Sequence, residues 1–363
     1  MQAELNEMIF YYPFIHYIID ANKKGGFILM TSKELVKKTL NFQSPERIPR
    51  QLWALPWADI YHKEALQEIN KDFPADIITS PGYLTSLPHT EGDPYMLGFS
   101  KDEWGCMFEN RQAGIIGEVK EPVLKDLKDV KDLRTPDELF SIDIQKINAF
   151  CKGNDHFVMG GCCPRPFERM QFLRKTENLY LDLAMQTDEL FMLIEKVHNF
   201  YKQELELWAL TDVDALMFMD DWGSQRALLI SPAMWQQLFK PLYKEYVDIA
   251  HQHGKSIFMH SDGNILQIIP DLIEIGVDAV NSQLFCMGID HLAPYKGKIT
   301  FWGEIDRQHL LPHGTHAEIQ KAVHLVKDTL YDKGGIIAQC EFGPGGNPDN
   351  VRTVFETWNT LQL

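Results

Sequence analysis

His260 and Asp262 form the sharpest chemical signal in the sequence. They lie at the end of a short β-rich run at 256–260, and residues two apart on extended backbone point to the same side. An imidazole beside a carboxylate suits a metal, because zinc accepts nitrogen, oxygen and sulfur ligands. We expect Cys340, at the end of a later run, to complete a three-ligand open site. The alternative is that His260 only hydrogen-bonds to Asp262 and that Cys340 is a small buried residue.

Three more acidic residues lie at the ends of β-rich runs and are candidate catalytic residues. Asp220 and Asp221 precede Trp-Gly and could act as acid, base or support for a ligand, or could cap the turn that follows. Glu304 is open to the same two interpretations.

A second group of residues at predicted strand ends or loops could form a substrate pocket. Aromatic side chains at such positions can wall an apolar pocket, although most aromatic residues belong to the core. The residues expected to bind substrate are Trp53, Trp57, Trp222, Asn264 and Glu341.

The elements that must position these residues alternate between β-rich runs and amphipathic stretches. Such alternation predicts parallel strands joined by helices, and eight runs suggest a closed (β/α)8 TIM barrel. Functional residues of such a barrel come from the carboxyl ends of its strands. The eight runs are 51–56, 76–80, 157–161, 214–220, 256–260, 278–281, 299–303 and 335–340.

Two segments depart from this alternation. Residues 81–135 carry scattered glycines among alternating apolar residues, which predicts a β-hairpin excursion after strand two. Thr31 and Glu34 have the spacing of a helix capping box. We therefore expect residues 1–29 to be an N-terminal extension and residues 30–363 to form the barrel domain.

Composition and charge limit the partners of the protein. Acidic residues outnumber Lys and Arg by 51 to 35, for a net charge of -16, so nucleic acid and anionic membranes are not expected partners. The apolar run at 8–19 is too short for a membrane span and lacks the basic flank of a signal peptide. Six cysteines without a C-x-x-C pair do not suggest a disulfide scaffold, and we expect a cytoplasmic protein.

Several motifs together resemble the uroporphyrinogen decarboxylase superfamily over about residues 31–360. They are Ser-Pro-Glu-Arg-Ile-Pro at 44–49, Asp-Asp-Trp-Gly at 220–223, His-Ser-Asp-Gly-Asn at 260–264, Ile-Pro-Asp-Leu-Ile at 269–273 and Phe-Trp-Gly-Glu-Ile-Asp at 301–306. The resemblance implies a TIM barrel and a possible homodimer. The superfamily contains uroporphyrinogen decarboxylases without a cofactor and zinc methyltransferases that work with corrinoid proteins.

Departures from the motifs favour the methyltransferase branch. The arginine-rich motif of true decarboxylases is replaced by Leu-Trp-Ala-Leu-Pro-Trp at 52–57. The methyltransferase zinc motif, His-x-Cys on strand five with a third ligand on strand eight, is matched by His260 and Cys340, whereas Asp262 replaces the usual Cys. An oxygen ligand leaves the ion a stronger Lewis acid, which favours an ether or amine substrate over a thiol.

The resemblance thus implies a zinc-dependent methyltransferase. It would move a methyl group between a small O- or N-methylated substrate, the methyl donor, and a corrinoid carried by a partner protein. The alternative is a cofactor-independent decarboxylase acting on a carboxylated substrate.

Overall fold

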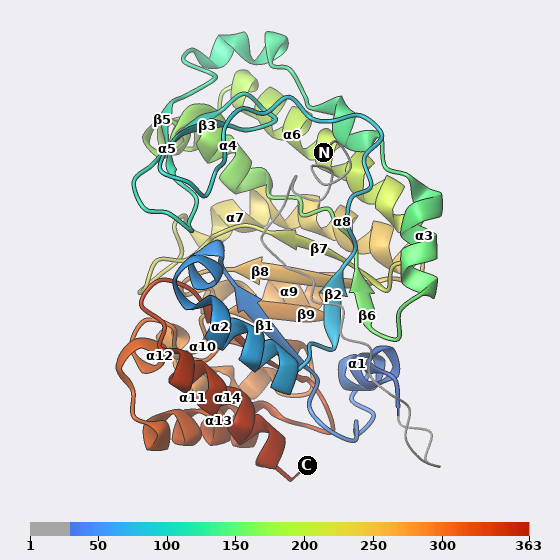
Figure 1. The fold of residues 1–363 in the computed structure, drawn as a ribbon. Coiled ribbons are helices and arrows are strands. Elements are labelled where there is room, and N and C mark those ends of the chain that lie inside the picture. Colours follow the sequence, from blue (N-terminus) through green and yellow to red (C-terminus); the bar gives the residue numbers. More distant parts are fainter. Residues whose placement is uncertain (1–29, 363) are drawn as a thin grey trace.

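Eight parallel strands form the central sheet of the computed structural model, which describes residues 30–362 (Figure 1). The order around the sheet is β1-β11-β10-β9-β8-β7-β6-β2, and hydrogen bonds from Asp76 N to Arg50 O (2.8 Å) and from Gln51 Nε2 to Ile77 O (3.2 Å) link its two ends. The protein is a nearly closed (β/α)8 barrel, and each of the eight predicted runs overlaps one of its strands. They are β1 (Arg50–Ala54), β2 (Ile77–Thr79), β6 (Phe157–Met159), β7 (Ala215–Met219), β8 (Ser256–Ser261), β9 (Ala279–Ser282), β10 (Thr300–Trp302) and β11 (Ile336–Phe342).

Helices join successive strands and surround the barrel (Figure 1). The segment before β7 forms two helices, α5 and α6, because Gln186 adopts a left-handed conformation (φ 50°) that ends the first of them. The helices are α1 (Ser32–Leu40), α2 (Pro56–Asp72), α3 (Ile144–Lys152), α4 (Pro166–Arg174), α5 (Thr176–Met185), α6 (Asp188–Ala209), α7 (Pro232–Leu238), α8 (Lys240–Gln252), α9 (Ile269–Ile275), α10 (Leu284–Met287), α11 (Ile289–Leu292), α12 (Leu310–His313), α13 (His316–Leu330) and α14 (Pro348–Thr360).

Alternation along the strands divides the core into two clusters. Inward-facing side chains such as Phe258 and Trp302 fill the barrel, and their rings meet edge to face at 5.0 Å. Outward-facing neighbours such as Met259 and Phe301 pack in the larger cluster beneath the helices. The direction in which a residue points at a strand end therefore decides whether it reaches the mouth or the outer core.

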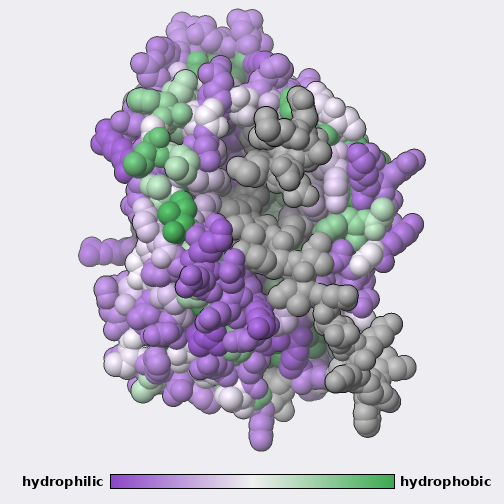
Figure 2. All heavy atoms as spheres, viewed as in Figure 1, coloured by the Kyte–Doolittle hydropathy of each residue, from purple (hydrophilic) through white to green (hydrophobic). Residues whose placement is uncertain are grey.

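The predicted excursion after β2 is a three-stranded antiparallel sheet of β3 (Gly98–Lys101), β4 (Met107–Asn110) and β5 (Glu118–Glu121). Trp104 packs edge to face on Phe200 of α6, and Trp57 N donates to Gly114 O at the barrel rim (3.0 Å). Figure 2 shows a mostly hydrophilic face, with hydrophobic residues gathered near this sheet. The excursion therefore packs on the outer helices and reaches the rim beside β1.

Helix α1 begins the described chain and is held by its predicted capping box. Thr31 Oγ1 accepts from Glu34 N (3.2 Å), and the Glu34 carboxylate accepts from Thr31 N (2.9 Å). Val36 of α1 packs with the inward-facing cluster, so the helix covers the end of the barrel at which the strands begin. The expected extension at 1–29 lies outside the described residues. Within 30–362, every helix is too short or too polar to span a bilayer.

Candidate metal centre

Asp221, His260 and Asp262 converge at the carboxyl ends of β7 and β8. One potential ligand atom from each residue lies within 4.8 Å of the other two. His260 Nε2 is 3.6 Å from Asp221 Oδ1 and 3.8 Å from Asp262 Oδ1. Donors at zinc-ligand distances in a tetrahedron are about 3.3–3.6 Å apart, so small side-chain movements would bring all three onto one ion. His260 and Asp262 come together as the sequence predicted, and Asp221 joins them.

The ring of His260 is oriented for a ligand at Nε2. The side chain is buried, and its Nδ1 lies 2.6 Å from Asn281 Oδ1. Asn281 donates its own amide group to the carbonyl of Trp302, which identifies Oδ1 as an acceptor and places a proton on His260 Nδ1. The lone pair of Nε2 therefore faces the two carboxylates, as metal-bound histidines require.

The electrostatics of the two carboxylates suit a bound cation. Asp262 Oδ1 is buried and has no hydrogen-bond partner within residues 30–362, whereas Oδ2 accepts from Arg307. Asp221 Oδ1 accepts from Asp262 N (3.0 Å). Removal from water, followed by the charge of Asp262, raises the pKa of Asp221 to about 6. A divalent ion would supply the missing partner of Asp262 and offset the repulsion, so these residues fit a metal.

Cys340 does not join this cluster, which corrects the expectation that it is a ligand. The side chain is fully buried in the outer core, and burial raises the pKa of its thiol. Strand alternation explains this placement, because the neighbouring Glu341 faces the mouth and meets Arg307 there. Asp221 takes the place beside His260 and Asp262 that was expected for Cys340.

Asp220 and Trp222 also lie in the outer core and not at the mouth. The Asp220 carboxylate accepts from Phe167 N (2.9 Å), Glu168 N (2.7 Å) and the hydroxyl of Tyr243 (2.6 Å). Trp222 stacks on Phe167 with ring centroids 4.1 Å apart and donates to the Tyr243 hydroxyl (2.8 Å). Asp220 thus anchors the first turn of α4, and neither residue has the catalytic or substrate-binding position expected.

Arg307, which the sequence analysis missed, links three carboxylates beside the cluster. It donates to Asp262 and from Nη1 to Glu341 (2.7 Å), and its Nε lies 3.7 Å from Glu304. Although burial opposes it, the three carboxylates raise the pKa of Arg307. Burial raises the pKa of Glu304 and of Glu341, partly offset by Arg307. Arg307 follows β10 by only five residues, so its place at a strand end was the available signal.

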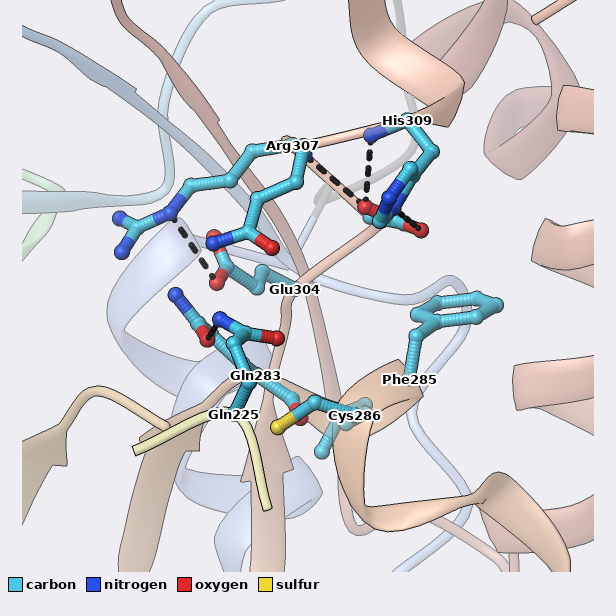
Figure 3. Close-up of a pocket in the computed structure, with 10 residues that line it drawn as sticks. Gln225, Gln283, Phe285, Cys286, Glu304, Arg307 and His309 are labelled. Carbon is cyan, nitrogen blue, oxygen red and sulfur yellow. Dashed lines mark hydrogen bonds and ion pairs between the residues drawn. The ribbon is translucent and has the colours of Figure 1, made fainter. Parts of the chain in front are cut away.

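Two cavities flank the cluster. One, of about 30 Å³, is largely apolar and adjoins His260. Its lining consists of Trp53, Thr79, Met159, Gly160, Gly161, Cys162, Cys163, Met217, Met219 and His260. The other, of about 110 Å³, lies beside Arg307 and is more polar (Figure 3).

Of the other residues expected to bind substrate, Trp53 lines a cavity, whereas Trp57 and Asn264 do not. Trp53 lines the apolar cavity, with its ring 5.2 Å from that of His260. Trp57 packs instead on Phe342 of the outer core, and Asn264 is held in the loop after β8 by a 3.4 Å bond to Cys286 O. Neither of these two lines either cavity.

Comparison with known proteins places this architecture in a family. A methyltransferase from Methanosarcina mazei shares the fold, with a TM-score of 0.65 at 16% identity over 91% of this chain and 99% of that chain. A B12-independent methionine synthase from Shewanella sp. W3-18-1 is more distant, with a TM-score of 0.43 at 12% identity over 82% of this chain and 84% of that chain. No curated protein matches the sequence. The family model for uroporphyrinogen decarboxylase (URO-D) matches residues 101–361, and the chain belongs to this family.

Proposed function

We propose that the protein is a metal-dependent methyltransferase, with zinc held by Asp221, His260 and Asp262. The observation that carries the proposal is the convergence of these three donors at the barrel mouth, directly beside a small apolar cavity. The methyltransferase of the same fold supports this choice within the family. Acceptance of the methyl group by a corrinoid on a partner protein is part of the proposal.

Each part of the site has a task in this reaction. A bound metal would act as a Lewis acid toward the oxygen or nitrogen of the methylated substrate. The apolar cavity beside His260 is suited to the methyl group, because its walls offer mainly methionine, cysteine and tryptophan side chains. Arg307 holds Oδ2 of Asp262, which leaves Oδ1 for the metal, and Asn281 holds the ring of His260.

The transfer needs no further oxidant or reductant. The bond between the methyl carbon and the heteroatom breaks, and its electron pair stays on the heteroatom, which takes a proton from solvent at the open mouth. The electron pair of the new carbon–cobalt bond comes from Co(I) of the corrinoid. Asp221, whose side chain is 39% exposed, marks the solvent side of the cluster.

Decarboxylation receives less support from the charges at the mouth. A carboxylated substrate needs free cationic donors. Arg307, which contacts the cluster, already donates to Asp262 and Glu341.

Metal analysis and a methyl-transfer assay test the proposal together. We expect about one zinc per chain in the wild type and in Cys340→Ala, and loss of zinc in Asp221→Ala, His260→Ala and Asp262→Ala. With free cob(I)alamin as acceptor and 2-methoxyethanol or dimethylamine as donor, the zinc-loaded wild type should form methylcob(III)alamin, which absorption spectroscopy detects. Retention of zinc by His260→Ala, or turnover that is unchanged after zinc has been removed, would contradict the proposal.

A further inference from the structure

The larger cavity beside the metal centre has no task in the methyl transfer described above. It lies at the carboxyl ends of β9 and β10, where Phe285 and Cys286 form one side and Glu304 and Arg307 the other (Figure 3). Arg307 also donates to Asp262, so the cavity adjoins the proposed metal ligands. A substrate bound at the metal could therefore extend into it.

Glu304 is a buried carboxyl group that lacks a hydrogen-bond donor. Its side chain is 4% exposed and lines the cavity. Within residues 30–362 it accepts no hydrogen bond, and the 3.7 Å to Arg307 Nε is too long for one. A buried carboxyl group that has an ion pair but accepts no hydrogen bond is incompletely satisfied, so a ligand that donates a hydrogen bond here would be stabilised.

Arg307 does not offer the cavity a free cationic site. Its Nη2 donates to Asp262 and its Nη1 to Glu341 at 2.7 Å. With its amide oxygen turned toward the guanidinium, Gln283 accepts from Arg307 Nε at 3.3 Å. With Nε, Nη1 and Nη2 already engaged, Arg307 gives a ligand carboxylate no free partner, and such a charge would be costly to bury here.

We propose that this cavity binds the part of the substrate that does not carry the transferred methyl group, and that this part is an alcohol or amine that donates a hydrogen bond to Glu304 and not a carboxylate. The inference rests on the proposed methyl transfer at the adjoining metal centre. Phe285 and Leu284 in the lining suit the short carbon chain that would join the two ends of such a substrate.

Three probes that differ only in one end group test this selectivity. They are 2-methoxyethanol, 2-methoxyethylamine and methoxyacetate, each titrated calorimetrically into the full chain with and without added zinc. We expect the alcohol and the amine to bind at least about tenfold more tightly than the acid, because the acid loses the hydrogen bond to Glu304 and buries a charge that has no free cationic partner in the cavity. Equal or tighter binding of methoxyacetate overturns the proposal, as does the absence of binding by all three probes.

Variants assign the selectivity to Glu304 and Arg307. Glu304→Met removes the acceptor at similar length and should weaken the alcohol and the amine about tenfold. Glu356→Met on the exposed face of α14 is the matched control and should change neither. Glu341→Gln releases Arg307 Nη1 from a carboxylate and should strengthen methoxyacetate binding severalfold. A Glu304→Met protein of unchanged melting temperature and zinc content that binds the alcohol and amine as the wild type does would contradict the proposal.

These measurements separate the inference from the proposed function. Binding of the probes is measured without turnover, so a preserved order of affinities in a protein that does not methylate cob(I)alamin would leave the cavity assignment standing and remove the methyl transfer. Methyl transfer combined with preferred binding of methoxyacetate would leave the methyl transfer standing and remove the cavity assignment.

Discussion

Asp220 and Asp221 are consecutive residues at the end of β7, yet they belong to different regions of the molecule. Asp220 is fully buried in the outer core, where two backbone amides and one tyrosine hydroxyl saturate its carboxylate. Asp221 faces the barrel mouth, where it lies 3.6 Å from His260 Nε2. A carboxylate whose lone pairs are already occupied stabilises the fold, whereas one directed at an unsatisfied neighbour is available to a ligand.

The same contrast recurs on β11, between Cys340 and Glu341. The thiol of Cys340 is enclosed by apolar residues of the outer core, whereas the carboxylate of Glu341 is paired with Arg307 at the mouth. In both pairs the direction of the side chain, and not the residue type, separates structural from chemical roles.

The largest effect on stability is expected at Asp220. Asp220→Ala would leave the amides at the start of α4 and the Tyr243 hydroxyl without their acceptor, and we expect the free energy of unfolding to fall by about 3 kcal/mol or more. Urea denaturation measures this change. The folded fraction should still bind one zinc. Loss of zinc from stably folded Asp220→Ala would show that Asp220, like Asp221, contributes to metal binding.

Asp221→Asn is the matched substitution on the other side of the contrast. It removes a charged ligand and should weaken zinc binding at least about 100-fold in competition with a chelator. The free energy of unfolding of the metal-free protein should change by less than about 1 kcal/mol, because an asparagine oxygen can still accept from Asp262 N. A large loss of stability with unchanged zinc affinity would assign Asp221 to the core.

The sequence predicted the barrel and two of the three residues of the candidate metal centre for identifiable reasons. Each of the eight runs overlaps a strand, because alternation of short β-rich runs and amphipathic helices is a local signal. His260 and Asp262 were paired correctly, because their two-residue spacing keeps them on one side. Cys340 was misplaced, although Gln339 and Glu341 on either side of it are polar and indicate that it faces the opposite way. Arg307 reaches the site from the loop after β10; its place near a strand end was a signal, but the direction of its side chain depends on the three-dimensional course of that loop.

Glu204 extends the comparison to a buried carboxyl group that lacks the saturating hydrogen bonds of Asp220. Burial, followed by the charge of Glu103, raises its pKa from the ordinary value of 4.5 to about 8. Between these pH values the folded protein holds a proton that the unfolded chain has released, so stability falls as pH rises. The unfolding free energy of the wild type relative to Glu204→Gln should therefore fall by about 1 kcal/mol per pH unit from about pH 5 to pH 8. Parallel pH profiles of the two proteins would contradict the raised pKa.

The smallest effect is expected at Cys340. Cys340→Ala removes one buried sulfur atom and should lower the free energy of unfolding by about 1 kcal/mol, as measured by urea denaturation. Zinc affinity and the selectivity for probes with an alcohol or amine end should match those of the wild type. If Cys340→Ala lost zinc affinity to the extent expected for Asp221→Asn, the thiol of Cys340 would have to be a metal ligand.

The central claim, that Asp221, His260 and Asp262 bind one metal ion, is tested most directly by anomalous diffraction at the zinc edge from crystals of the zinc-loaded protein. The account predicts a single strong peak at the barrel mouth, about 2.0–2.2 Å from His260 Nε2 and from one oxygen of each aspartate. A peak bonded to Cys340, or full zinc occupancy with no peak between these three side chains, would contradict it.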